Sequence, residues 1–285
     1  MSKILPAIDH VVIGVNSQLD AAAKRYRELG FELLERGHHT LGTSNHLAIF
    51  GDDYLELLGY EPPQAQAQAS NPMWRHPAGL LGLVFKPDNV HALGDRLRAQ
   101  GLTVEQPRAF SRPVKLPDGQ FADARFETLH LPPETTAGGV VFFCQHHTPQ
   151  NVWRNEWRQH PNGVTGIREF IVSATDPAAS VQPFTKVFDT AVVTTVPGGL
   201  RLSAGRGDVL FLEPQAIVRR FGIGGAATVQ GEDRFAGLVF QTKDLSALRS
   251  LLQAASIPEV LERDATLIIP AAQAFGVTLA FTEGK

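Results

Sequence analysis

The sequence lacks what a disulfide framework, a thiolate metal cluster or a membrane span would require. Cys144 is the only cysteine among 285 residues, so an internal disulfide and a cluster of several thiolates are both excluded. No apolar run approaches the roughly 20 residues that a transmembrane helix needs. The 26 basic and 29 acidic residues nearly balance, so neither nucleic acid nor an anionic membrane surface is expected as a partner.

The remaining composition is that of an ordinary globular protein. Hydrophobic residues make up 43% and charged residues 19%, which is enough apolar material for sizeable cores. The length predicts about two domains. Pro6 interrupts the first apolar residues, so we expect no secretion signal and a cytoplasmic protein.

One succession of segments recurs along the chain. Alternating and helical apolar spacings predict a strand at 8–15, a helix at 19–29 and three strands at 31–35, 45–50 and 53–58. The same order is predicted to begin again at 80–85, with strands at 102–106, 124–131 and 140–145, and then at 166–173 and 235–242. The tetrapeptide Gly-Leu-Val-Phe at 82–85 and 237–240 is a visible trace of this repetition.

The repeated unit predicts the fold. A βαβββ unit alone exposes the concave face of a small sheet, and pairing two units closes that face into a cavity. The sequence therefore predicts an α+β fold of four βαβββ units paired into two domains, 1–147 and 163–285, and a homodimer is possible. Residues 60–78, rich in Pro, Gln and Ala, are predicted to form a linker or flap.

His10 and Glu56 are predicted to face one cavity. Alternation places His10 opposite to Val11 on its strand and Glu56 opposite to Leu55 and Leu57. A carboxylate within an apolar strand is costly to bury unless a charge or a metal offsets it. An imidazole and a carboxylate together suit a divalent ion such as Zn, Mn, Ni, Co or Fe.

Neighbouring strands add further candidates. Leu47 and Ile49 are apolar and are assigned to the covered face, which leaves His46 and Phe50 for the cavity. His46 is then a candidate acid–base group or a wall residue. Tyr54 is predicted to face the cavity by the same alternation.

Arginines of the second unit are candidates for binding a substrate carboxylate. Arg125 is the main candidate, with Arg108 and Arg112 beside it in the sequence, because a guanidinium binds a carboxylate in bidentate fashion. His38 and His39 stand beside predicted turns and are expected to be solvated.

These segments resemble the vicinal oxygen chelate superfamily, to which glyoxalase I, bleomycin-resistance proteins and extradiol dioxygenases belong. The likeness is carried by the strand with His10, by Leu-Gly-Phe at 29–31 and by Tyr-Leu-Glu-Leu at 54–57. The segments 39–45 and 143–149 are similar to the glyoxalase-like branch. The resemblance implies two glyoxalase/bleomycin-resistance/dioxygenase-like domains, of which the second is degenerate.

The resemblance also implies a set of metal ligands. In this superfamily the first and last strands of each unit supply them, and in the first unit they match His10 and Glu56. In the second unit the matching positions are Gly82, which has no side chain to coordinate, and a residue near Gln145. Alternation favours Gln145 as the third ligand, and a shift by one residue would bring His146 into its place.

Two classes of function follow. The first is a metal-dependent lyase or isomerase for a small substrate with vicinal oxygens, in which Glu56 or His46 moves a proton. The second is a metal-free protein that binds or sequesters a small molecule in a cavity lined by Phe50, Tyr54 and Phe143. An extradiol dioxygenase is less favoured, because the second domain lacks the histidines that the resemblance requires.

Overall fold

The computed structural model describes residues 5–40, 42–60, 78–132, 136, 138–188, 192–222 and 233–284. Most of the connector predicted at 60–78 therefore lies outside the described residues. No helix within the described ranges is long and apolar enough to cross a membrane.

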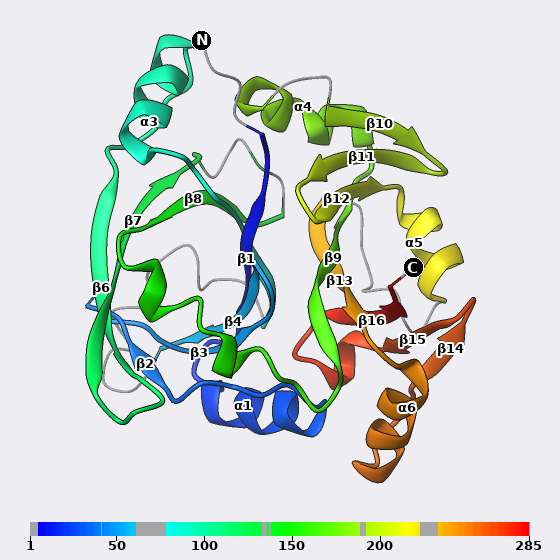
Figure 1. Ribbon diagram of the computed structural model, residues 1–285. Coiled ribbons are helices and arrows are strands. Elements are labelled where there is room, and N and C mark those ends of the chain that lie inside the picture. Colours follow the sequence, from blue (N-terminus) through cyan, green and yellow to red (C-terminus); the bar gives the residue numbers. More distant parts are fainter. Residues whose placement is uncertain are drawn as a thin grey trace.

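Two eight-stranded sheets stand side by side (Figure 1). The first has the order β2-β3-β4-β1-β5-β8-β7-β6. Its elements are β1 (Ile8–Gly14), α1 (Leu19–Glu28), β2 (Gly37–His38), β3 (Ser44–Ile49), β4 (Tyr54–Gly59), β5 (Gly79–Phe85), α3 (Val90–Ala99), β6 (Arg108–Lys115), β7 (Phe121–His130) and β8 (Val140–His146).

The second sheet repeats this arrangement with the order β10-β11-β12-β9-β13-β16-β15-β14. Short 3-10 turns at Pro149–Asn151 and Asn155–Trp157 lead into it. Its elements are β9 (Val164–Ser173), α4 (Pro177–Val187), β10 (Val193–Val196), β11 (Gly199–Ala204), β12 (Gly207–Leu212), α5 (Pro214–Phe221), β13 (Arg234–Thr242), α6 (Leu245–Ala254), β14 (Leu261–Arg263), β15 (Thr266–Ile269) and β16 (Thr278–Glu283).

Each sheet joins two βαβββ units through their first strands. β1 runs antiparallel to β5, and β9 runs antiparallel to β13. Within a unit the first strand runs parallel to the last, so that His10 lies opposite Tyr54. The predicted α+β fold of four paired βαβββ units is confirmed.

One hydrophobic core covers the outer faces of both sheets. Helices α1, α3, α4 and α6 bury their apolar stripes in it, as amphipathic surface helices do. Phe31 of the first half lies with its ring centroid 5.3 Å from that of Phe240 in the second. Because this core is continuous between the halves, it does not divide the chain, and the domain bounds 1–147 and 163–285 stay a prediction.

The concave faces of the two sheets differ. Helix α5 places Ala216, Ile217 and Phe221 against the second sheet, so the chain fills its own cavity there. Glu169, the residue at the position of His10, pairs with Arg220 of this helix at 2.5 Å. On the first sheet, the outer strands β2 and β6 approach each other and enclose a pocket.

Two strand predictions are wrong. Residues 31–35 have no regular structure, and the second strand is only the two-residue β2. Residues 102–106 are also irregular, and β6 begins at Arg108. In both stretches apolar side chains such as Phe31, Leu33 and Val104 are buried against the shared core, so their apolar character does not indicate strand pairing.

Asp53, immediately before β4, joins the two halves. Its Oδ1 accepts a hydrogen bond from the backbone N–H of Ile167 in β9, at 3.2 Å. Burial raises the pKa of Asp53 to about 7, partly opposed by this N–H and by Lys86.

We expect the free energy of unfolding to fall as the pH rises from about 4 to 7, because folded Asp53 keeps a proton that the unfolded chain has lost. The fall is at most about 4 kcal/mol, at roughly 1.36 kcal/mol per pKa unit. Asp53→Asn keeps the acceptor without the charge, so it should be more stable than wild type at pH 8. Denaturant unfolding at pH 5 and pH 8 measures this.

The exposed Asp95 of α3 provides the control for this experiment. Its side chain is 79% exposed beside Arg98, and it is not among the groups that shift the pKa of Asp53, so Asp95→Asn should leave the pH dependence as in wild type. Equal pH dependence in wild type and Asp53→Asn would contradict the assignment.

Candidate active site

A pocket of about 370 Å³ lies on the concave face of the first sheet. This volume falls within the range of small-ligand sites. Its polar wall includes His10, His39, Asn45, Tyr54, Glu56, Arg112 and Cys144, and its apolar wall includes Leu47, Phe110, Phe126 and Phe142.

Asp9 and His10 are neighbours in β1 that hydrogen bond to each other. Regular alternation would turn them to opposite faces, but the pairing of β1 with β5 shifts between Ile8 and His10. Asp9 Oδ1 lies 2.6 Å from His10 Nδ1, and His10 Nε2 lies 3.6 Å from Glu56 Oε2. A histidine that binds a metal through one ring nitrogen commonly donates the N–H of the other to a carboxylate.

Glu56 is fixed from β3. The side-chain amide of Asn45 donates to Glu56 Oε1 at 2.6 Å, and the same nitrogen lies 3.1 Å from His39 Nε2. His39 Nδ1 lies 2.7 Å from the hydroxyl of Thr43. Burial lowers the pKa of His39 to about 4, although Glu56 opposes this, so the imidazole is neutral at pH 7.

The second unit offers no matching ligands. A local twofold axis relates β1 to β5, and under this axis the position of His10 corresponds to that of Gly82. On β8 the residue that matches Glu56 is Phe142. Glu56 lies two residues after Tyr54, the partner of His10, and Phe142 lies two residues after Val140, the partner of Gly82. A Cβ on Gly82 would lie 3.0 Å from Val12, so a side chain at this position would have to displace Val12.

The predictions for β8 assign its residues to the wrong faces of the sheet. Gln145 Oε1 accepts a hydrogen bond from the N–H of Val90 at the start of α3, at 2.8 Å. Phe143 is fully buried in the shared core against Phe188. The alternation that favours Gln145 as a ligand would turn Phe142 and Cys144 to the covered face, but both line the pocket.

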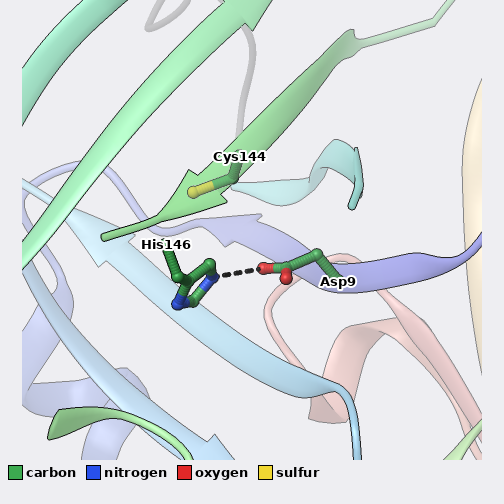
Figure 2. Close-up of side chains that lie close together, drawn as sticks. All are labelled: Asp9, Cys144 and His146. Atoms are coloured by element: carbon green, nitrogen blue, oxygen red, sulfur yellow. Dashed lines mark hydrogen bonds and ion pairs between the residues drawn. The ribbon is translucent and has the colours of Figure 1, made fainter. Parts of the chain in front are cut away.

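Figure 2 shows His146, the alternative to Gln145, next to Asp9 and below Cys144. His146 Nε2 lies 3.0 Å from Asp9 Oδ1. The donor atoms of Asp9, Cys144 and His146 lie within 4.8 Å of one another and form a possible metal-binding group.

The charges in this group follow from burial and contact. Burial alone would raise the pKa of Asp9, but His146 and His10 outweigh it and hold this pKa well below its usual range. Burial raises the pKa of the Cys144 thiol well above its ordinary value, and nearby Asp9 and Glu56 raise it further. The group therefore holds an ionised carboxylate and a protonated thiol.

His46 and Phe50 face away from the pocket, so their predicted placement is wrong. His46 Nδ1 lies 2.8 Å from the carbonyl oxygen of Leu34, and burial lowers the pKa of this imidazole. Phe50 packs in the shared core, with its ring 5.0 Å from that of His160. Leu47 lines the pocket in their place.

The predicted binding residues divide in two. Tyr54 lines the pocket as predicted and stacks on His10, with ring centroids 4.3 Å apart. Arg125 is exposed on the other face of β7 and lines a separate surface depression with Thr40, so its prediction as a pocket residue is wrong. Arg112 of β6 enters the pocket instead.

Sequence reasoning missed three polar residues of the site, and it named a fourth, Arg112, only as a companion of Arg125. Asp9 is hidden by the irregular pairing of β1. His39 and Asn45 lie in the segment 39–45, whose likeness to the glyoxalase-like branch was the available signal. The expectation that His39 is solvated is wrong, since its side chain is 9% exposed.

Comparison with known proteins gives a family match and a shared fold. The profile of the glyoxalase-like domain matches residues 8–188. A hypothetical protein from Staphylococcus aureus is 14% identical, with 99% of this chain and 100% of that chain covered and a TM-score of 0.71. No curated protein sequence matches.

Two further solved structures share the fold. A mutant of 4-hydroxymandelate synthase from Streptomyces coelicolor is 13% identical over 98% of this chain and 93% of that chain, with a TM-score of 0.58. A xylose isomerase-like TIM barrel/4-hydroxyphenylpyruvate dioxygenase fusion protein is 14% identical, and 100% of this chain covers 50% of it, with a TM-score of 0.57.

Gln145 should behave as a helix cap. Gln145→Ala is expected to lower the free energy of unfolding by roughly 1 kcal/mol, because the N–H of Val90 loses its acceptor. Gln145→Glu should retain the stability, since its carboxylate accepts the same bond at a helix N-terminus. Denaturant unfolding measures both. Loss of bound metal in Gln145→Ala at unchanged stability would return this residue to the candidate ligands.

Proposed function

Since the chain belongs to the glyoxalase-like domain family and has the fold of the vicinal oxygen chelate superfamily, we propose that it is a divalent-metal-dependent enzyme. The reaction would be of the lyase or isomerase type, on a small substrate with vicinal oxygens. One observation carries this proposal: His10 Nε2 faces Glu56 Oε2 at 3.6 Å in a buried pocket, while Asp9 fixes the other ring nitrogen.

The donor set fits a divalent ion. Two ligand atoms that share a metal at bonds of roughly 2.1 Å lie about 3 to 3.5 Å apart, close to the separation of His10 Nε2 and Glu56 Oε2. His39 Nε2 lies 3.9 Å from the other oxygen of Glu56 and would become a third donor once the Asn45 amide, whose nitrogen lies 3.1 Å from it, turned away. Two imidazoles and one carboxylate make a set that leaves coordination positions open. His10, Glu56 and His39 would hold the ion.

A bound divalent ion would supply Lewis-acid stabilisation of the negative charge that develops on the substrate oxygens. The chain itself supplies the proton-handling groups. Glu56 and His10 face the pocket, and the hydrogen bonds of Asp9 continue from His10 to His146. Burial raises the pKa of Tyr54 well above its usual value, so this phenol is a hydrogen-bond donor and not a base.

A metal-free binding protein is the second candidate. Gly82 and Phe142 stand where the second unit would supply ligands, and Phe142 turns an edge toward His10 at 5.7 Å between ring centroids. Phe110 and Phe126 stack at 5.1 Å in the same pocket and suit an apolar or aromatic ligand. His10 and Glu56 would then form an internal pair. An extradiol dioxygenase is less favoured, since α5 fills the second sheet.

Metal content distinguishes these candidates. Purified wild type should contain nearly one equivalent of Zn, Mn, Ni, Co or Fe by mass spectrometry, and His10→Ala and Glu56→Ala should lose it because each removes a ligand. Asp9→Asn should weaken metal binding by about 10- to 100-fold, since it removes the group behind His10.

His46→Ala and Cys144→Ser are the matched controls and should keep the metal. Loss of metal in Cys144→Ser and His146→Ala, with retention in Glu56→Ala, would place the ion at the Asp9, Cys144 and His146 group. Metal-free wild type that cannot be reloaded, with His10→Ala and Glu56→Ala folded normally, would contradict the enzyme proposal. Ligand-induced thermal stabilisation would then test the binding protein.

A further inference from the structure

A buried guanidinium lies in the pocket with part of its hydrogen-bonding capacity unused. Arg112 of β6 is 3% exposed and lines the same pocket as His10 and Glu56. Its Nη2 atom is buried and has no hydrogen-bond partner among the residues that the structure describes. Burial lowers the pKa of Arg112, opposed by Tyr54 and Glu56. An arginine nevertheless stays charged at pH 7, and an unpaired buried charge is costly.

No carboxylate in the described part of the chain compensates Arg112 by direct contact, since none forms an ion pair with it within 4.0 Å. Glu56, the carboxylate that lines the pocket, is already engaged. Its Oε1 accepts from Asn45, and its Oε2 faces His10. Arg112 is therefore available to a ligand.

The neighbouring strands leave room for the Arg112 side chain. Arg112 lies opposite Ala124 in the β6–β7 hairpin, and its aliphatic stem passes Gly37 of β2. A Cβ on Gly37 would lie 3.1 Å from Arg112 Cδ and 2.5 Å from Asn45 Oδ1. The glycine thus leaves the space that lets a long cationic side chain enter an enclosed pocket beside the hydrogen-bonded Asn45.

We propose that Arg112 binds a carboxylate of the substrate, and that the substrate is a small monocarboxylic acid with an apolar remainder. A guanidinium matches a carboxylate through two parallel hydrogen bonds. The stacked rings of Phe110 and Phe126 and the side chain of Leu47 provide the apolar wall. The proposal also requires a second oxygen on the carbon next to the carboxylate. This requirement rests on the proposed function, in which the substrate has vicinal oxygens.

The guanidinium groups of the pocket favour a single carboxylate on the ligand. One carboxylate can pair with the unpartnered Nη2 atom of Arg112. Among the described residues of the pocket wall, the other guanidinium, that of Arg108, already pairs with Glu105 at 3.3 Å, so a second carboxylate would lack a partner.

The test is calorimetric titration with three 2-hydroxy acids, lactate, 2-hydroxy-4-methylpentanoate and 3-phenyllactate, and with the neutral amide of each. Titrations use metal-loaded and chelator-treated protein. Metal-loaded wild type should bind at least one acid at least about 10-fold more tightly than its amide. Arg112→Met should weaken acid binding on the order of 100-fold and leave amide binding unchanged. Arg125→Met, at an exposed arginine of the next strand, is the matched control and should bind as wild type does.

Arg112→Lys covers the case in which Arg112→Met does not fold. It keeps the charge but loses the bidentate geometry, so acid binding should weaken by about 10-fold. Failure of all three acids to bind wild type, equal affinity for acid and amide, or undiminished acid binding in both variants would overturn the inference.

Metal content measured on the same samples separates this inference from the proposed function. Arg112 supplies no ligand atom, so Arg112→Met should keep its metal while losing the acid, which supports the inference. Wild type without metal that still prefers the acid, with the preference lost in Arg112→Met, contradicts the metal enzyme and supports the carboxylate site.

Discussion

The candidate site depends on one buried carboxylate that two imidazoles share. Asp9 Oδ1 lies 2.6 Å from His10 Nδ1 and 3.0 Å from His146 Nε2, and the side chain is 1% exposed. An ionised carboxylate at this depth persists only because charge-assisted hydrogen bonds replace its hydration. The contact joins β1 of the first unit to the end of β8 in the second. The same interaction therefore orients His10 toward Glu56 and fixes the two units of the sheet relative to each other.

Polar residues revealed the face of a strand where only one face is polar. On β1 and β4 the placements of His10, Tyr54 and Glu56 in the pocket agree with the alternation, because the residues that alternate with them, such as Val11 and Leu55, lie in the shared core. On β3 and β8 both faces carry apolar residues, one toward the shared core and one toward the pocket wall. Alternation then fixes which residues share a face but not which face is inside, and Phe50 and Phe143 were assigned wrongly.

The repeat was readable from the sequence, but its functional asymmetry was not. The symmetry that takes His10 to Gly82 and Glu56 to Phe142 leaves one half of the pocket polar and the other apolar. Arg112 departs from this division, since it reaches the polar half from β6 of the second unit. That placement depends on where β6 begins and on the closure of the sheet, where the N–H of Thr40 donates to the carbonyl of Ser111 at 3.3 Å. Neither is a local property of the sequence.

The second sheet and the connector before it contribute to the site by holding the strands that carry it. Asp53, at the turn before β4, accepts from the N–H of Ile167 in β9, and in the connector before β9 His160 Nε2 lies 2.8 Å from the carbonyl oxygen of Ile49 at the end of β3. Both contacts fix the β3–β4 hairpin, which carries Asn45 and Glu56 to the pocket. A hydrogen-bonded carboxylate keeps its geometry only when the strands beneath it are rigid. Although α5 fills the concave face of the second sheet, this half of the chain still acts on the site indirectly, by positioning Glu56.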